Sequence, residues 1–276
     1  MVIVIQCKDR VGLVAEISAV LAKFNINIVA MREFVDTLDG DFFARLEVGP
    51  HPDVNHIQAT LEKVLPALAM VKVNPNPDKK LAILVTKEYH CLSDILVRNH
   101  FKTLGATVQV VIGNHPNLED ICKRFEIPFY YISNVGVDKE KYEQAIQDVL
   151  NLYDFDYLIL AKYMRILSTQ FVAQYPNQII NIHHSFLPAF IGASPYRQAF
   201  ERGVKLIGAT AHFVTNELDE GPIISQQIIP VNHTFSVDDM IGAGKEIEKS
   251  VLSKAISLVI QDRVFSFKHK TVVFDS

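Results

Sequence analysis

The chain has no tryptophan and only three cysteines among its 276 residues, Cys7, Cys91 and Cys122. An odd and scattered set of this size does not build the disulfide framework of a small secreted domain. The sequence also lacks an apolar run long enough to cross a bilayer, and no signal peptide precedes its first strand-like segment. We therefore expect a cytoplasmic protein that does not associate with membranes.

An excess of positive charge is missing as well. Lysine and arginine number 27 against 31 aspartate and glutamate residues, so the formal net charge is −4. Without a basic stripe to follow a phosphate backbone, nucleic acid is not an expected partner. The ten histidines show no His-x-x-His spacing, and neighbours such as His183 and His184 would point to opposite faces of an extended strand. We expect no metal ion and no cofactor.

A proline-containing stretch at residues 74–80 divides the chain. Its two prolines, Pro75 and Pro77, disfavour a helix and leave the segment extended or turning. We predict a domain at residues 1–75, a linker at 76–80 and a second domain at 81–276, which is long enough to bury its own core.

The first domain has the pattern of a βαββαβ unit of the ferredoxin-like type. Residues at helical spacing follow the first strand, and Asp39-Gly40 marks a hairpin turn. Strands are predicted at residues 2–7, 42–48 and 71–73, and a further strand begins at 25–29. Helices are predicted at about 13–24 and 54–65.

The second domain alternates compact apolar runs with helical patterns, which indicates a doubly wound, mostly parallel α/β sheet. Strands are expected at 81–86, 107–112, 129–131 and 157–161, with helices between them at 95–104 and 142–152. A last helix at about 237–259 has apolar positions for packing. Its charged residues are expected to form a solvated face: Glu246, Glu248, Lys249 and Lys254.

Polar residues with catalytic potential follow two later strand-like runs. Asn181 and His183 end a run that reads as a buried parallel strand, and a second such strand at 207–214 leads into the turn that holds Asp219. Ligands bind beyond the carboxyl ends of strands in open α/β sheets, so we expect the three side chains to converge. An amide and an imidazole can stabilise an oxyanion, and a carboxylate can orient the imidazole. Taken alone, each of these residues is explained more simply by a local hydrogen bond in a turn or by a contact in the core.

Four separated segments resemble the folate-dependent formyltransferase family: residues 161–167, 181–188, 208–214 and 218–224. In that family an Asn, the His two residues later and the Asp before Gly-Pro are the catalytic trio. The resemblance implies these roles for Asn181, His183 and Asp219. It also implies a folate pocket lined by Met164, Arg165, Ile166 and Leu167.

Further segments resemble the branch of the family that hydrolyses 10-formyltetrahydrofolate to tetrahydrofolate and formate, a linear amide hydrolysis that balances one-carbon folate pools for purine synthesis. They are residues 90–92, 181–188, 192–205 and 270–274. The first strand of the second domain leads into bulky and acidic residues rather than into a glycine-rich loop that could hold the phosphate of a sugar-phosphate acceptor. We therefore expect water to accept the formyl group. A small amine acceptor is the alternative. Further substrate contacts are expected from His184, Ser185, Leu218, Glu220, Gly221 and His90.

The first domain resembles the ACT family of amino-acid-binding modules. The resemblance rests on a strand-to-helix turn and on the residues that follow the first helix, and it implies an effector site at Asp9, Gly12, Leu13, Asn25 and Asn27. Glycine or methionine is the first effector to expect, although such a module can serve assembly alone. Because these modules pair, we expect a homodimer or a homotetramer.

Overall fold

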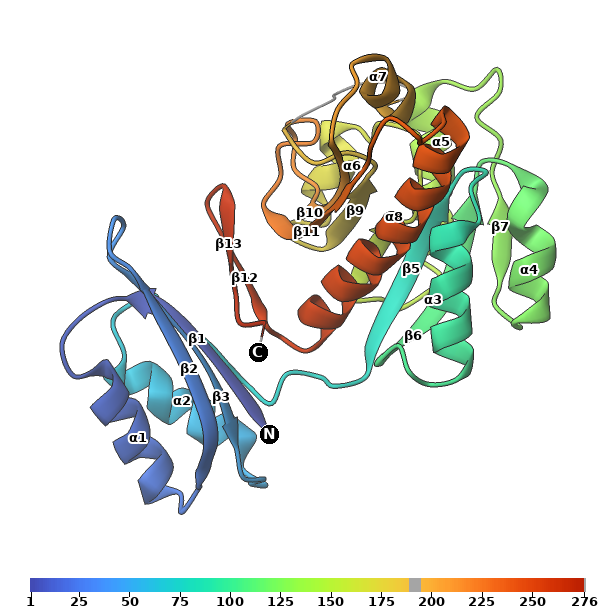
Figure 1. The fold of residues 1–276 in the computed structure, drawn as a ribbon. Coiled ribbons are helices and arrows are strands. Elements are labelled where there is room, and N and C mark those ends of the chain that lie inside the picture. Colours follow the sequence, from blue (N-terminus) through green and yellow to red (C-terminus); the bar gives the residue numbers. More distant parts are fainter. Residues whose placement is uncertain (189–194, 276) are drawn as a thin grey trace. The chain divides into compact units, whose positions relative to one another are not determined.

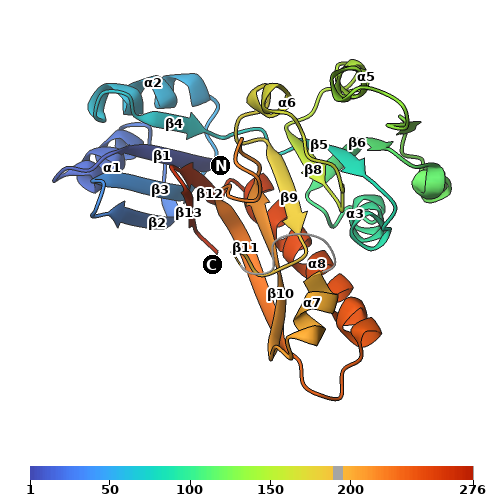
Figure 2. The ribbon, with the colours of Figure 1, turned by 90° about the horizontal axis from the view of Figure 1, so that it is seen from above.

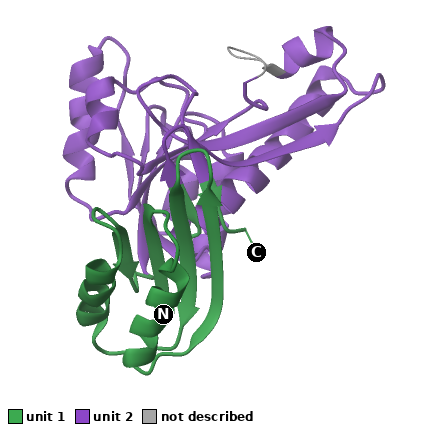
Figure 3. Cartoon of the chain, turned by 90° about the vertical axis from the view of Figure 1, so that its left-hand side faces the viewer, with its two compact units in different colours: residues 1–77, 262–265, 272–276 green, residues 78–261, 266–271 purple. Residues whose placement is uncertain are grey.

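The chain folds into two compact units (Figure 3). The structure is a computed structural model that describes residues 1–188 and 195–275. Unit 1 holds Met1–Pro77, Asp262–Phe265 and Val272–Ser276, and unit 2 holds Asp78–Gln261 and Ser266–Thr271. The chain thus passes from one unit to the other between Pro77 and Asp78, inside the proline-containing stretch. The C-terminal segments, which we expected wholly in the second domain, are divided between the units.

Unit 1 contains a four-stranded antiparallel sheet (Figure 1), and its strand order, β2-β3-β1-β4, can be followed in Figure 2. Its elements are β1 (Val2–Lys8), α1 (Leu13–Lys23), β2 (Ile28–Asp36), β3 (Asp41–Val48), α2 (Val54–Val64) and β4 (Met70–Val73). The two helices share one core with the sheet, in which Ile17 of α1 and Ile57 of α2 join Ile3 and Ile5 of β1. The predicted βαββαβ ferredoxin-like unit is confirmed.

Unit 2 is built on a seven-stranded sheet with strand order β11-β10-β9-β8-β5-β6-β7. Five neighbouring strands are parallel: β9 (Ile179–His183), β8 (Tyr157–Leu160), β5 (Lys79–Val85), β6 (Ala106–Gly113) and β7 (Phe129–Tyr131). The predicted mostly parallel α/β sheet is confirmed. However, β10 (Leu206–Phe213) is antiparallel to β9 and to β11 (Ile223–Pro230), so our expectation of a second parallel strand there was wrong.

Helices cover both faces of this sheet (Figure 2). On one face α5 (Lys139–Leu150) and α6 (Thr169–Ala173) share a core with β5, β6 and β8. On the other, α3 (His90–His100) packs against α8 (Val237–Ile260), which also contacts β9, β10 and β11. The remaining elements are η1 (Pro116–Leu118), α4 (Glu119–Arg124), α7 (Pro195–Glu201), β12 (Val264–Phe267) and β13 (Lys270–Val273). No helix in the described part of the chain is long and apolar enough to cross a membrane.

Helix α8 begins with a capping box at Ser236. The hydroxyl oxygen of Ser236 accepts a hydrogen bond from the backbone N–H of Asp239, and the Asp239 carboxylate accepts one from the backbone N–H of Ser236. These bonds satisfy donors that the first turn of a helix leaves without intrahelical partners. The cap therefore determines where the helix starts beside β9, β10 and β11.

We predict that Ser236→Ala lowers the free energy of unfolding by about 1 kcal/mol, the usual value of such a cap. Urea denaturation measures the loss. The control is Ser250→Ala, an exposed position in the same helix where alanine is the better helix former. Equal stability of Ser236→Ala and the wild type would show that the cap is not needed.

Candidate active site

Strand β9 directs two polar side chains into the same region. Side chains alternate along a strand, so Asn181 and His183 share one face of β9, while Ile182 between them points to the other and is buried. The neighbouring β10 is antiparallel, and its register sets His212 opposite Asn181. A third polar side chain thereby joins the site by strand pairing.

The loop between β10 and β11 returns the chain to β9. Phe213 N donates a hydrogen bond to Pro222 O and closes the loop. Gly221 is required at this closure because a Cβ there would lie 1.7 Å from Phe213 O. Asp219 adopts a left-handed backbone conformation, with φ 57°, which aspartate tolerates better than most residues. The loop thus presents the Asp219 carboxylate to the histidines of β9 and β10.

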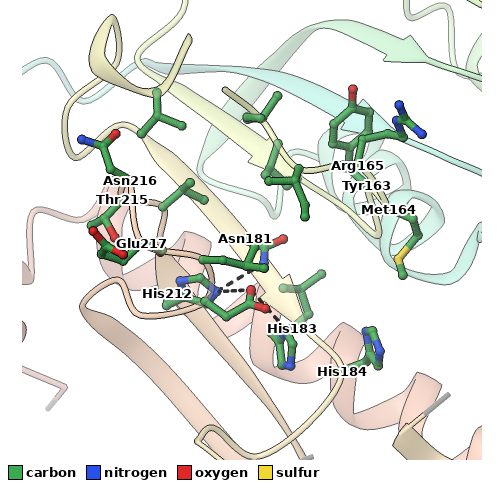
Figure 4. Close-up of a pocket in the computed structure, with 18 residues that line it drawn as sticks. Tyr163, Met164, Arg165, Asn181, His183, His184, His212, Thr215, Asn216 and Glu217 are labelled. Atoms are coloured by element: carbon green, nitrogen blue, oxygen red, sulfur yellow. Dashed lines mark hydrogen bonds and ion pairs between the residues drawn. The ribbon is translucent and has the colours of Figure 1, made fainter. Parts of the chain in front are cut away.

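Four side chains meet at this point (Figure 4). Asp219 Oδ1 lies 3.3 Å from His183 Nδ1 and 3.7 Å from His212 Nε2, and Asn181 Nδ2 lies 3.2 Å from His212 Nε2. Asn181, His183 and Asp219, the predicted trio, are therefore in one place. His212 was not predicted as a site residue, because only the pairing of β10 with β9 reveals its position.

Hydrogen bonds determine which ring nitrogens of the histidines carry protons. His212 Nδ1 lies 2.9 Å from Phe213 O, a carbonyl that can only accept, so Nδ1 is the donor. In the neutral ring, His212 Nε2 then accepts a hydrogen bond from the Asn181 amide. His183 Nδ1 faces the Asp219 carboxylate and donates to it. His183 Nε2 is buried and has no partner among the described residues, which leaves it available to a substrate.

Asp219 is held in its ionised form. Burial opposes the charge on this carboxylate and is the largest single influence, but the hydrogen bond from His183 and the positive charge that His183 and His212 carry when protonated together hold the pKa of Asp219 well below its usual range. An ionised carboxylate only accepts hydrogen bonds. Asp219 is therefore suited to orienting His183 and holding a water molecule.

A cavity of about 470 Å³ opens in front of these residues. Its lining includes all four residues of the predicted folate segment, Met164 to Leu167, together with His184 and Leu218. Met164, Ile166 and Leu218 are more than half exposed, so the rim is apolar while the inner wall is polar. This arrangement suits a ligand with a flat apolar body and one reactive polar group.

Several predicted contacts do not line this cavity. Ser185 is buried, and its carbonyl accepts a hydrogen bond from Thr210 Oγ1. Glu220 is exposed, and Gly221 serves the loop closure. His90 lies elsewhere, in a buried group of charges described below. Neighbours of a catalytic residue in sequence need not face the same way in space, and the substrate contacts of these four residues stay predictions.

His90 belongs to a buried cluster around Glu248 of α8. His90 Nε2 lies 2.7 Å and Lys162 Nζ 3.1 Å from Glu248 Oε2, and the Tyr196 hydroxyl donates to Glu248 Oε1 at 2.7 Å. Burial disfavours the charge, but His90, Lys162 and Tyr196 lower the pKa of Glu248 to about 2. Glu248 is only 1% exposed, so its predicted place on a solvated helix face was wrong.

The same cluster includes the one group among the described residues that is spaced to hold a metal ion, namely His90, Cys91 and Glu248. The ammonium of Lys162 already contacts Glu248 and would repel a cation. Burial raises the pKa of the Cys91 thiol far above its usual range, whereas a metal ligand must be a thiolate. These residues fit a metal poorly. The absence of a catalytic metal remains a prediction.

In unit 1, the predicted effector residues surround the start of α1 and the segment after it. Gly12 precedes α1 with φ 94°, a conformation that favours glycine. Asn25 is also left-handed, with φ 57°, and Asn27 O accepts a hydrogen bond from Gly49 N. The Asp9 backbone N–H bonds to Gly40 O. Leu13 is 2% exposed and packs in the core, so its side chain supports the turn from inside.

Comparisons with known proteins agree with this architecture. The profile of the family described as formyl transferase matches residues 79–256, and that of the ACT domain matches residues 1–66. Formyltetrahydrofolate deformylase of Escherichia coli (strain K12) is 47% identical over 267 residues, covering 97% of this chain and 95% of that protein. The chain belongs to the formyltetrahydrofolate deformylase family. Formyltetrahydrofolate deformylase of Haemophilus influenzae is 46% identical, with 99% and 98% covered.

Solved structures of this family have the same fold. A formyltetrahydrofolate deformylase from Pseudomonas syringae pv. tomato superimposes with a TM-score of 0.93 at 38% identity, covering 99% of this chain and 94% of that one. Glycinamide ribonucleotide transformylase 1 from Symbiobacterium toebii reaches a TM-score of 0.69 at 29% identity and covers 73% of this chain and 96% of its own. The fold of unit 2 is thus shared with transferases, whereas the deformylase matches extend over nearly the whole chain.

We predict that Gly221→Ala destabilises the fold by about 1–3 kcal/mol, the usual cost of overpacking. The new Cβ would displace Phe213 O, which is also the acceptor of His212 Nδ1. Urea denaturation measures the stability. The control is Gly242→Ala in α8, where a Cβ meets nothing within 4 Å and alanine favours the helix. A Gly221→Ala variant as stable as the wild type would refute the role of this glycine.

Proposed function

We propose that the chain hydrolyses 10-formyltetrahydrofolate to tetrahydrofolate and formate. The observation that carries the proposal is the contact of Asn181, His183 and Asp219 at the inner wall of an apolar-rimmed cavity. Membership of the deformylase family over almost the full chain supports it. Transfer of the formyl group to a small amine acceptor has no comparable support, because the full-length relatives are named deformylases.

In the proposed binding mode, the folate ring system lies against the apolar rim. Met164, Ile166 and Leu218 supply this surface, and Arg165 at the same rim suits an acidic part of the ligand. The formyl group then points inward, toward His183. An apolar rim with a few polar groups at its inner end is the usual arrangement for orienting a flat ligand.

Catalysis begins with a water molecule held by the ionised Asp219. Its oxygen attacks the formyl carbon, the π electrons of the carbonyl move to the oxygen, and Asp219 accepts the proton that the water releases. The negative oxygen receives hydrogen bonds from the Asn181 amide and from Nε2 of His183, whose ring is doubly protonated at this step. Loss of one such donor usually costs about 3–4 kcal/mol of transition-state stabilisation.

Breakdown of the intermediate requires a proton on N10 of the folate. We assign its delivery to Nε2 of the doubly protonated His183, which has no partner among the described residues, while Nδ1 keeps its proton toward Asp219. The carbon–nitrogen bond then breaks, its electron pair stays on N10, and formic acid leaves. It returns a proton to His183 Nε2 and becomes formate, and Asp219 releases the proton taken from water to the solvent. The step uses only side chains of the chain and needs neither a metal nor a cofactor.

We also propose an amino-acid effector, an oligomeric state and a location for the protein. An amino acid, glycine or methionine first, binds in unit 1 near Gly12, where the backbone N–H groups at the start of α1 favour a carboxylate. The match to the ACT domain over residues 1–66 supports this site. We further propose a homodimer or homotetramer that works in the cytoplasm without nucleic acid or membrane partners.

We expect purified protein treated with a metal chelator to release formate from 10-formyltetrahydrofolate without any added acceptor. A formate assay coupled to a dehydrogenase measures the product. Folate binding without formate release would overturn the proposed hydrolysis. Activity that disappears with chelation and returns with added metal would overturn the metal-free mechanism.

We predict that Asp219→Asn lowers turnover by at least about 100-fold, the usual contribution of a general base. Asparagine also tolerates the left-handed backbone at this position, so the loop and folate binding should persist. Steady-state kinetics and ligand titration separate the two effects. The control is Asp120→Asn, which removes only an exposed ion pair with Arg124. Unchanged turnover in Asp219→Asn would refute the assignment.

A further inference from the structure

Beside the active site, unit 2 contains a line of alternating charges that the mechanism does not use. Lys245 Nζ lies 2.8 Å from Glu88, Glu88 lies 3.7 Å from His90 Nδ1, and His90 Nε2 lies 2.7 Å from Glu248. The line ends at Lys162, 3.1 Å from Glu248. Its outer members are partly exposed, whereas the side chains of Glu248 and Lys162 are 1% and 10% exposed. A buried ion pair is costly to form, so its position calls for an explanation.

The register of the sheet places the inner ion pair next to the catalytic histidine. Leu160 of β8 pairs with Asn181 of β9 in the parallel ladder. Strand β8 ends at Leu160, two residues before Lys162, and His183 is the last residue of β9, so both side chains follow from the carboxyl ends of neighbouring strands. Helix α8, which carries Glu248, packs against β9. The ion pair therefore lies beside the end of β9.

The backbone at Lys162 adopts a conformation that lysine disfavours. Lys162 has φ 60°, in the left-handed region where glycine is favoured and a lysine is sterically disfavoured. A glycine would relieve the strain but would leave Glu248 without its ammonium partner. The ammonium of Lys162 thus balances the buried carboxylate of Glu248 on a helix that packs against β9.

The positive charge of Lys162 acts on His184, the residue that follows His183. His184 lines the cavity, and its ring stacks on that of His183 with centroids 5.2 Å apart and an interplanar angle of 14°. Burial, Lys162 and His183 disfavour a charge on His184, and they outweigh Glu248 and Asp219, which favour it. Together they lower the pKa of His184 to about 4. Its ring is therefore neutral at pH 7, with one nitrogen able to accept a hydrogen bond.

We infer that Lys162, held in place by Glu248, is a positioning residue that keeps His184 uncharged. The neutral ring accepts a hydrogen bond from the attacking water and orients it toward the formyl carbon. The role rests on the proposed hydrolysis and changes none of its steps: the proton of the water still passes to Asp219. A charged His184 would instead donate to the water, turn its lone pairs away from the carbon and repel a proton on His183.

The test is Lys162→Met, which removes the charge and retains a long side chain. Removing a positive charge leaves Glu248 and Asp219 to stabilise the protonated ring, so the titration midpoint of His184 should rise by about one pH unit. NMR of histidine labelled with ¹³C at Cε1 measures this midpoint, with His184→Gln to assign the signal. The acid limb of formate release should move to higher pH with it, and activity should recover as the pH is raised.

Two further variants isolate the charge. Lys162→Arg keeps the positive charge, so the titration midpoint of His184 and the low-pH decline of formate release should both match those of the wild type. Lys80→Met is the matched control, since it also breaks a lysine–carboxylate pair, Lys80 Nζ to Asp154 at 2.7 Å, in unit 2. If Lys162→Met does not fold, the double variant Lys162→Met/Glu248→Gln leaves no lone buried charge. It should also raise the midpoint, because Lys162 acts on His184 more strongly than Glu248 does.

A folded Lys162→Met or double variant with an unchanged His184 titration would overturn the inference. So would a shifted titration that leaves the acid limb of formate release where it was, because His184 would then have no part in orienting water. A wild-type chain that releases no formate would refute the proposed function and, with it, the water-orienting role. The NMR titration needs no turnover, so it still decides whether Lys162 controls the charge of His184.

Discussion

The antiparallel pairing of β9 with β10 is the interaction on which the site depends. It sets His212 opposite Asn181, and it starts the following loop beside β9, so that Asp219 reaches His183 at 3.3 Å. Because β10 is antiparallel, its last residue Phe213 pairs with Ile180, and the loop that follows begins beside the strand that carries Asn181 and His183. The closure of the loop at Gly221, where no Cβ fits, maintains this arrangement.

Two ionised carboxylates lie on either side of the adjacent histidines. Asp219 contacts His183, and Glu248 is paired with the lysine that acts on His184. Both carboxylates have a lowered pKa, about 2 for Glu248, despite burial. A folded-state pKa below the unfolded value of about 4 contributes stability above that value, and this contribution is lost as the pH falls through the folded pKa. The site is therefore built for neutral solution and loses stability in acid.

Most of the fold could be predicted from local patterns. The apolar run at residues 81–86 and the helical spacing in residues 54–65 correspond to β5 and α2 within two residues. Prediction failed where a residue's environment comes from distant parts of the chain. Glu248 has helical neighbours like those of a solvated face, but His90 and Lys162, far away in sequence, bury and pair it. His212 was not predicted as a site residue, because the direction of β10 cannot be deduced from the composition of its strand.

The sequence by itself determined the boundary within the proline-containing stretch, most of the strands and helices, and the presence of Asn181, His183 and Asp219 with their turn chemistry. These depend on side-chain periodicity and on the backbone preferences of proline, glycine and aspartate, which act over a few residues. Only the tertiary structure decided which predicted residues face the cavity, why His212 joins them and how Lys162 and Glu248 reach His184. The physical reason is that burial and pairing of charges depend on strand direction and helix packing, which join residues far apart in the chain.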